Sequence, residues 1–199
     1  MRRLWHGGHT APPESAAHTS IGAIAHRRIT DAANEPDPRS ALFQLQKTYT
    51  AGDTDLAWTR LTNWRIQLAA VMDQLDATEV SAVTVEGASD SPSTVLLAAW
   101  LTLALKVPVT IAARPDGSGI RSVRLSRRNG DIELCRPNRT VAELYQPRQH
   151  VQRISLPRRS LQDCLAEELR RLDPDEVFGE VITEGLARTN LRSVRTSER

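Results

Sequence analysis

The sequence predicts a mixed α/β domain, in which a strand-helix-strand crossover unit is followed by an antiparallel strand meander and two carboxy-terminal helices. Three observations predict this fold class. An apolar helical segment lies between two segments rich in β-branched residues, short strand-like segments separated by turns follow, and two segments with helix-capping residues come last. A chain of 199 residues is long enough to bury the core of one such domain.

The two ends of the chain differ from the middle in composition. Residues 1–25 are short of bulky apolar side chains and rich in Gly, Ala, Pro, Ser and His, and residues 188–199 are polar and rich in Arg. Such segments bury too little surface to offset the loss of conformational entropy. We therefore expect a flexible segment over residues 1–35, the α/β domain over residues 36–187, and a disordered tail over residues 188–199.

The first two elements of the domain are predicted to be helices. Asp37 and Pro38 start the first helix, which ends before Gly52. Asp53 or Thr54 can cap the second helix. Its apolar residues recur at helical spacing, and they are Leu61, Trp64, Leu68, Val71, Met72 and Leu75.

The crossover unit follows. Residues 79–86 are rich in β-branched side chains and stop at Gly87, as a strand that enters a loop does. Ser91 and Pro92 supply a cap and a first-turn proline for a helix to about Leu105, and residues 107–112 are predicted to form a second strand. A strand-helix-strand order of this kind indicates a right-handed crossover onto a parallel pair.

Strands alone follow the crossover unit, and two helices close the domain. The strands are expected at residues 120–126, 131–136, 140–145 and 151–156, with Asn129-Gly130 as a type I′ hairpin turn. One closing helix is expected over residues 160–171. The other begins near Asp173, which is expected to cap it, with Glu176 three residues on.

Composition restricts the classes of function. The formal net charge is +2, but residues 114–171 hold 13 Arg against 7 Asp and Glu, which favours an anionic partner. No helix-turn-helix, zinc-finger or RNA-binding signature accompanies these arginines, so we expect no nucleic-acid partner. The two cysteines form no disulfide framework, and no signal sequence or long apolar run is present, so we expect a cytoplasmic protein outside the membrane.

Two sets of polar residues are candidate small-ligand sites. Gly87, Ser89, Ser91 and Ser93 lie between a strand and a helix, where N–H groups can hold a phosphate. This loop lacks the Gly-Lys-Ser/Thr ending of a nucleotide-binding loop, and a capped helix start explains its residues equally well. The histidines near the amino terminus have no carboxylate or cysteine nearby to complete a metal site, so we expect no metal; they are His6, His9 and His18.

Cysteines and tryptophans give further candidates. Cys164 lies on or beside a helical apolar stripe and is expected to be buried, whereas Cys135 shares a strand face with Glu133 and is a candidate redox-sensitive thiol. Trp64 is expected in the core. Trp58 lies off the main apolar stripe, and tryptophan is a frequent interface residue.

Several stretches of the chain, in order and spacing, resemble the OpcA family of glucose-6-phosphate dehydrogenase assembly proteins. The resemblance runs from about residue 20 to about residue 185 and corresponds to the family's carboxy-terminal part. The stretches are residues 25–32 (AHRRITDA), 52–65 (GDTDLAWTRLTNWR), 85–87 (VEG), 91–92 (SP), 96–101 (LLAAWL), 156–159 (LPRR) and 164–176 (CLAEELRRLDPDE).

The resemblance implies a function in regulation. Full-length members carry a further amino-terminal domain, of which residues 1–35 would be a remnant. Family members are non-catalytic proteins that bind glucose-6-phosphate dehydrogenase and favour its active oligomer, and so raise NADPH output from the oxidative pentose phosphate pathway without a cofactor of their own. The partner-binding residues expected from the matching stretches are Thr54, Asp55, Trp58, Arg60 and Arg65, followed by Arg158 and Arg159.

An alternative from another class stays open at this point. The Gly87–Ser93 loop would make the protein a sensor or enzyme for a sugar phosphate or nucleotide. Arg121, Arg124 or Arg158 would then contact the anion.

Overall fold

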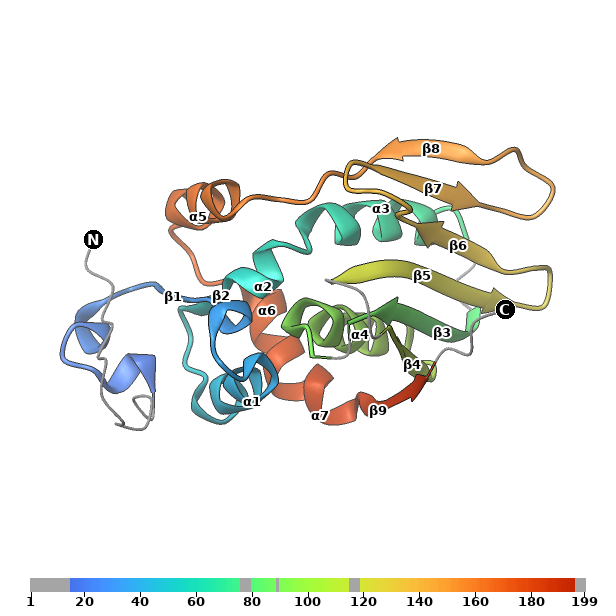
Figure 1. Cartoon of the computed structure of the whole chain (residues 1–199). Helices are drawn as coiled ribbons and strands as arrows, with labels where there is room; N and C mark the ends of the chain where they lie inside the picture. Colours follow the sequence, from blue (N-terminus) through green and yellow to red (C-terminus); the bar gives the residue numbers. More distant parts are fainter. Residues whose placement is uncertain (1–14, 76–79, 89, 115–118, 196–199) are drawn as a thin grey trace.

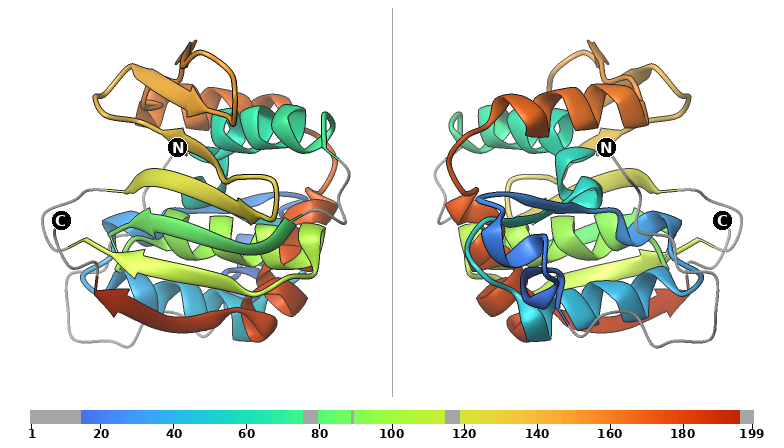
Figure 2. Two further views of the ribbon diagram at one scale, coloured as in Figure 1. Left: turned by 90° about the vertical axis from the view of Figure 1, so that its right-hand side faces the viewer. Right: turned by 90° about the vertical axis from the view of Figure 1, so that its left-hand side faces the viewer.

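A seven-stranded sheet in the order β8-β7-β6-β5-β3-β4-β9 runs through the structure, and a two-stranded sheet of β1 and β2 lies apart from it (Figure 1). The structure is a computed structural model that describes residues 15–75, 80–88, 90–114 and 119–195. Figure 2 shows the helices gathered on one face of the large sheet, with the other face open. The mixed α/β class predicted from the sequence is confirmed.

The elements have the following bounds. The strands are β1 Arg28–Thr30, β2 Asp53–Asp55, β3 Val80–Gly87, β4 Val109–Ala113, β5 Ile120–Arg127, β6 Ile132–Cys135, β7 Val141–Tyr145, β8 Gln152–Ser155 and β9 Asn190–Arg195. The α-helices are α1 Pro38–Thr48, α2 Leu56–Thr59, α3 Thr62–Met72, α4 Pro92–Leu105, α5 Leu161–Arg170, α6 Glu176–Glu180 and α7 Leu186–Arg188. Short 3-10 turns η1 Ala16–His18, η2 Gly22–Ile24 and η3 Ala32–Asn34 precede α1, and a π-helical turn, η5 Val181–Gly185, joins α6 to α7.

The crossover unit is present as β3, α4 and β4. The strands β3 and β4 pair in parallel, with Val85 opposite Ile111. Helix α4 has Pro92 in its first turn and ends at Lys106, whose φ is 55°. Because α4 packs between the sheet and the neighbouring helices, most of its side chains are buried, and this explains why its sequence is apolar on every side.

The meander β5-β6-β7-β8 is antiparallel throughout, as expected. Its first hairpin differs from the prediction. Gly130 has a φ of 106°, but Asn129 is not among the residues with positive φ, so the turn is not type I′. The N–H of Gly130 donates to the carbonyl of Arg127 at 3.2 Å, and glycine alone supplies the left-handed position.

Side chains alternate between the two faces of the sheet. Val85, Val123 and Leu134 lie in one row across β3, β5 and β6 and are buried under the helices. The adjacent row on the open face is polar. It contains Glu86, Ser122, Cys135, Glu143 and Arg153.

Two predicted capping residues are wrong. The single helix expected after Asp53 is the strand β2 followed by α2 and α3. The side chain of Asp55 accepts from the N–H of Ala57 at 2.8 Å and caps α2, so neither Asp53 nor Thr54 is the cap. Asp175, not Asp173, caps α6 by accepting from the N–H of Phe178 at 2.9 Å. In both cases an Asp two residues further along meets the helix start.

Two expectations about the ends of the chain are also wrong within the described residues. Residues 28–30, in the segment expected to be flexible, pair in parallel with residues 53–55. Residues 190–195, in the expected disordered tail, pair in parallel with β4. Backbone pairing with a distant strand stabilises both segments, and their own composition does not show it. Among the described residues, no helix has both the length and the apolar character needed to cross a bilayer.

Leu101 tests the packing of α4. Its side chain is fully buried in the core, whereas Leu172 is 85% exposed. Leu101→Ala is expected to lower the free energy of unfolding by about 2–5 kcal/mol, because it leaves a cavity that the surroundings fill only in part. Leu172→Ala is the matched control and is expected to change it by less than about 0.5 kcal/mol. Urea denaturation followed by tryptophan fluorescence measures both, and equal losses would contradict the placement of α4.

Candidate functional site

Glu168 on α5 is a buried carboxylate with two side-chain partners. It is 1% exposed. Its Oε2 lies 2.7 Å from Nη2 of Arg27, and its Oε1 accepts a hydrogen bond of 2.7 Å from the hydroxyl of Thr59. Arg27 also donates to the backbone carbonyl of Asp173. A buried carboxylate is tolerated only with such partners, so this network joins the amino-terminal segment, α2 and α5.

A second buried carboxylate, Asp55, joins the strands β1 and β2 to the segment that follows β1. Its Oδ2 accepts from the hydroxyl of Thr30 at 2.6 Å and from the N–H of Ala32 at 2.9 Å. Burial raises the pKa of Asp55, and the three hydrogen bonds that the carboxylate accepts oppose that rise. On the same pair of strands, Arg28 forms an ion pair with Asp53.

Trp58 lies at the centre of a third set of contacts. Its ring is fully buried, and its Nε1–H donates to Asp175 at 2.9 Å. The guanidinium of Arg65 stacks 3.8 Å from the ring centroid. Burial by itself raises the pKa of Asp175, but hydrogen bonds from the Phe178 N–H and Trp58 and the charges of Arg65 and Arg171 together lower it. The ionised form of Asp175 is therefore favoured.

These contacts correct the predicted partner-binding residues. Thr54, Asp55 and Trp58 are fully buried, so they cannot form a docking surface in this structure. Arg60 forms two hydrogen bonds with Asp31, at 2.6 and 2.8 Å, and Arg65 covers Trp58. The assumption that core packing does not require these side chains is wrong, because they satisfy buried polar groups. Arg158 is exposed and Arg159 is half-buried.

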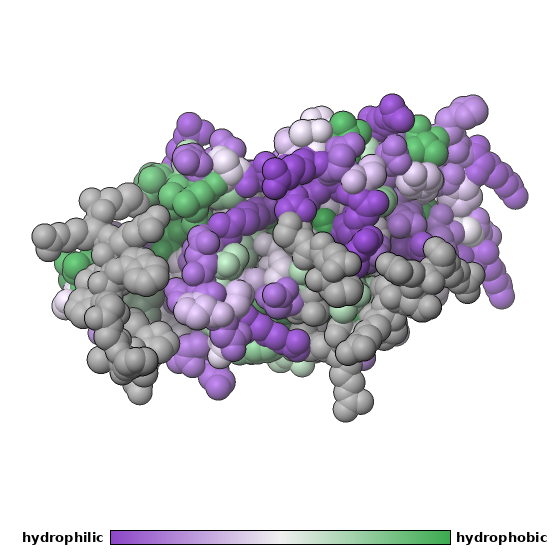
Figure 3. All heavy atoms as spheres, in the orientation of Figure 1, coloured by the Kyte–Doolittle hydropathy of each residue, from purple (hydrophilic) through white to green (hydrophobic). Residues whose placement is uncertain are grey.

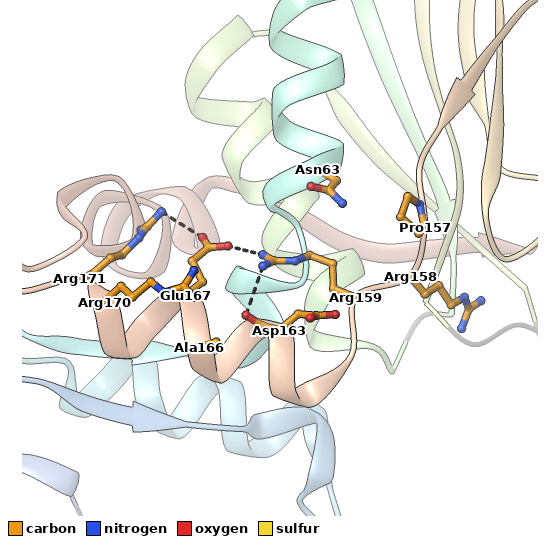
Figure 4. Close-up of a pocket in the computed structure, with 9 residues that line it drawn as sticks. All are labelled: Asn63, Pro157, Arg158, Arg159, Asp163, Ala166, Glu167, Arg170 and Arg171. Carbon is orange, nitrogen blue, oxygen red and sulfur yellow. Dashed lines mark hydrogen bonds and ion pairs between the residues drawn. The ribbon is translucent and has the colours of Figure 1, made fainter.

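Arg158 and Arg159 line a pocket of about 570 Å³ between α3, α5 and the connection from β8 to α5 (Figure 4). We call it the arginine pocket. Figure 3 shows hydrophilic side chains over this connection, next to a hydrophobic area on α5. The lining holds four arginines and two carboxylates. Its residues are Asn63, Pro157, Arg158, Arg159, Asp163, Ala166, Glu167, Arg170 and Arg171.

Glu167 holds two of these arginines in place. Its Oε2 lies 2.5 Å from Arg159 Nη1 and its Oε1 lies 3.2 Å from Arg171 Nη2, and the two arginines approach it from opposite sides (Figure 4). Arg159 also donates to the carbonyl of Thr59 at 2.8 Å. The second carboxylate, Asp163, completes the capping box of α5 with Ser160.

The two other arginines lie at the edge of the arginine pocket. Arg158 and Arg170 are both exposed, and Figure 4 shows Arg158 directed away from Glu167. With both carboxylates already engaged, the lining has two more cationic than anionic side chains, which is a suitable surface for an anionic group. Arg170 and Arg171 were not predicted from the sequence. The Glu167 to Arg171 spacing of four residues on a predicted helix was the available signal.

The predicted phosphate loop is occupied by contacts within the chain. The hydroxyl of Ser93 donates to the carbonyl of Ala57 at 2.8 Å, and the N–H of Ala88 donates to the carbonyl of Gly119 at 3.1 Å. A side chain at Gly87 would meet the Gly119 carbonyl at 2.8 Å, so this glycine is required by close packing of the two strands. Ser91 is half-buried at the start of α4, and Ser89 lies outside the described residues.

The cysteine and histidine candidates have ordinary environments. Cys164 is fully buried, as expected. Cys135 is half-buried on the open face of the sheet, and burial raises the pKa of its thiol, which lowers the thiolate fraction and hence its reactivity. His18 is exposed, His6 and His9 lie outside the described residues, and the described part of the chain contains no group of three metal-binding side chains.

Comparison with protein families identifies the chain. The model of the OpcA family that describes the carboxy-terminal domain of this glucose-6-phosphate dehydrogenase subunit matches residues 51–182. The chain belongs to the OpcA family. The match confirms the resemblance seen in the sequence and covers β2, the crossover unit, the meander and the arginine pocket of this OpcA-family chain. No curated protein matches the chain significantly.

Solved structures give weaker likenesses. Two structures of the 3-ketoreductase KijD10 from Actinomadura kijaniata, in complex with TDP-benzene and NADP, match at 11% identity. The structure of a point mutant has a TM-score of 0.49 over 82% of this chain and 68% of that one, and the open conformation has a TM-score of 0.48 over 85% and 69%. Likeness at this level carries no inference about function.

Glu168→Gln tests the buried network. Removing the charge leaves the guanidinium of Arg27 without its buried counter-ion, so the free energy of unfolding is expected to fall by about 3–5 kcal/mol. Glu184→Gln is the control, because the side chains of Glu184 and its partner Arg188 are 58% and 64% exposed. That pair is expected to contribute less than about 1 kcal/mol. Denaturant unfolding measures both variants, and similar small effects would show that the Arg27–Glu168 pair does not support the fold.

Proposed function

We propose that this OpcA-family chain is a non-catalytic assembly factor for glucose-6-phosphate dehydrogenase that acts in the cytoplasm. It binds the dehydrogenase, favours its active oligomer, and thereby raises NADPH production by the oxidative pentose phosphate pathway. The observation that carries this proposal is the family match over residues 51–182. A protein that binds the active assembly more tightly than the inactive one shifts the population by the difference in affinity and needs no chemistry of its own.

The arginine pocket is our proposed docking site for the dehydrogenase. Its exposed arginines, Arg158 and Arg170, meet acidic side chains of the partner at the rim, and Glu167 holds Arg159 and Arg171 in fixed positions. Side chains that are ordered before binding lose less conformational entropy when the complex forms. Arginine is also one of the residue types that contribute most to interface affinity.

The alternative function, a sugar-phosphate or nucleotide sensor built on the Gly87–Ser93 loop, has less support. The Ser93 hydroxyl and the Ala88 N–H already have acceptors in the chain. Binding a phosphate there would break contacts that position α4. The family match and the loop contacts therefore both favour the assembly role.

The direct test is dehydrogenase activity with and without the purified chain, using the enzyme from the same organism, together with size-exclusion chromatography of the mixture. A rise in activity with co-elution as a larger assembly is the expected result. Unchanged activity and separate elution, with a chain that is folded by circular dichroism, would refute the assembly role.

Arg170→Glu tests the docking site. The substitution places a negative charge where acidic partner side chains are proposed, so the dissociation constant is expected to rise at least about tenfold. Arg153→Glu makes the same change of charge on β8, where the side chain is 79% exposed, and is expected to leave binding within about twofold. Titration by biolayer interferometry at two salt concentrations measures both. Equal weakening by the two variants would show that only net charge matters, and not the arginine pocket.

A further inference from the structure

Arg136, just after β6, is an arginine in a buried position. It is 9% exposed, its Nη2 donates to the carbonyl of Ile120 at 3.2 Å, and its guanidinium carbon lies 5.2 Å from the ring centroid of Trp64. Burial first, and then the charge of Arg158, lower the pKa of Arg136 to about 10. Both effects show that the positive charge is held in an unfavourable environment.

Other arginines surround this position. Arg121 donates through Nη1 to the backbone carbonyl of Arg136 at 2.7 Å. The chain after β8 runs beside the loop after β6, because the N–H of Arg158 donates to the carbonyl of Arg139 at 3.0 Å. Neither Arg121 nor Arg136 forms an ion pair with a carboxylate of the described residues. This corner of the molecule therefore collects guanidinium groups around a buried one.

We propose that Arg136, together with Arg121 and Arg158, binds the phosphate group of a small phosphorylated metabolite. Buried cations are normally paired, and Arg136 has only a backbone carbonyl and an aromatic ring as partners among the described residues. A phosphate monoester carries close to two negative charges and offers several oxygens to planar guanidinium donors, which a single carboxylate does not. The proposal does not depend on docking to the dehydrogenase.

The position in the fold suits a ligand. Ile120, which accepts from Arg136, is opposite Gly87 in the pairing of β5 with β3, so the site lies beside the carboxyl end of β3, where the chain turns into α4. Ligands of α/β sheets bind at such ends. The ring of Trp64 supports the face of Arg136 and keeps the guanidinium from turning away. The proposed site uses these side chains and not the N–H groups of the Gly87–Ser93 loop.

Thermal unfolding of the full chain in inorganic phosphate, against chloride at matched ionic strength, tests the proposal. At about ten times the dissociation constant, phosphate is expected to raise Tm by about 4 °C. Arg158→Gln, at an exposed position that folding does not require, is expected to lose that rise, and Arg136→Lys to lose most of it. Arg124→Gln, whose side chain is 52% exposed and paired with Glu133, is the control and is expected to keep it.

Parallel titrations identify the source of the phosphate. Glucose 6-phosphate and AMP present the same group on a sugar and on a nucleoside, and a larger shift with one of them than with inorganic phosphate would name the class. Equal shifts for all three would support recognition of phosphate alone. No shift with any of them, or a shift that Arg158→Gln leaves intact, would overturn the proposal while leaving the assembly function untouched.

Discussion

The fold depends on the buried carboxylate of Glu168. Its two oxygens join Arg27 of the amino-terminal segment to Thr59 of α2, across a sequence separation that no local structure spans. Removing either partner would leave a charge or a hydroxyl without a partner in the core, which costs more than the exposed ion pairs elsewhere in the chain contribute. The same constraint fixes α5, and through it Glu167 and the arginine pocket, against the rest of the domain.

Periodicity and turn residues were enough to predict the sheet and its order of elements. Alternation in β5 to β8 and the apolar character of α4 follow from local rules, and these elements lie close to their expected positions. The strands β1 and β9 could not be predicted, because their stability comes from pairing with β2 and β4, far away in the sequence. The break between α2 and α3 could not be seen because the apolar spacing continues across it.

The candidate site was predictable only in part, for a physical reason. Polar and aromatic residues such as Asp55 and Trp58 look alike in sequence whether they face a partner or satisfy a buried group, and here they are internal. Arg158 and Arg159, which the matching stretches indicate, do line the arginine pocket, while the contribution of Glu167 depends on a helix face that sequence alone does not orient. The residues shared with the family thus divide into an internal network and an exposed cationic surface.

We infer that this division separates folding from docking. Hydrogen exchange of the chain, alone and bound to glucose-6-phosphate dehydrogenase, tests it most directly. We expect slower exchange on binding at residues 157–171, which form the wall of the arginine pocket, and no change along β5 to β8 on the open face of the sheet. Protection confined to the open face, with residues 157–171 unchanged, would contradict this separation.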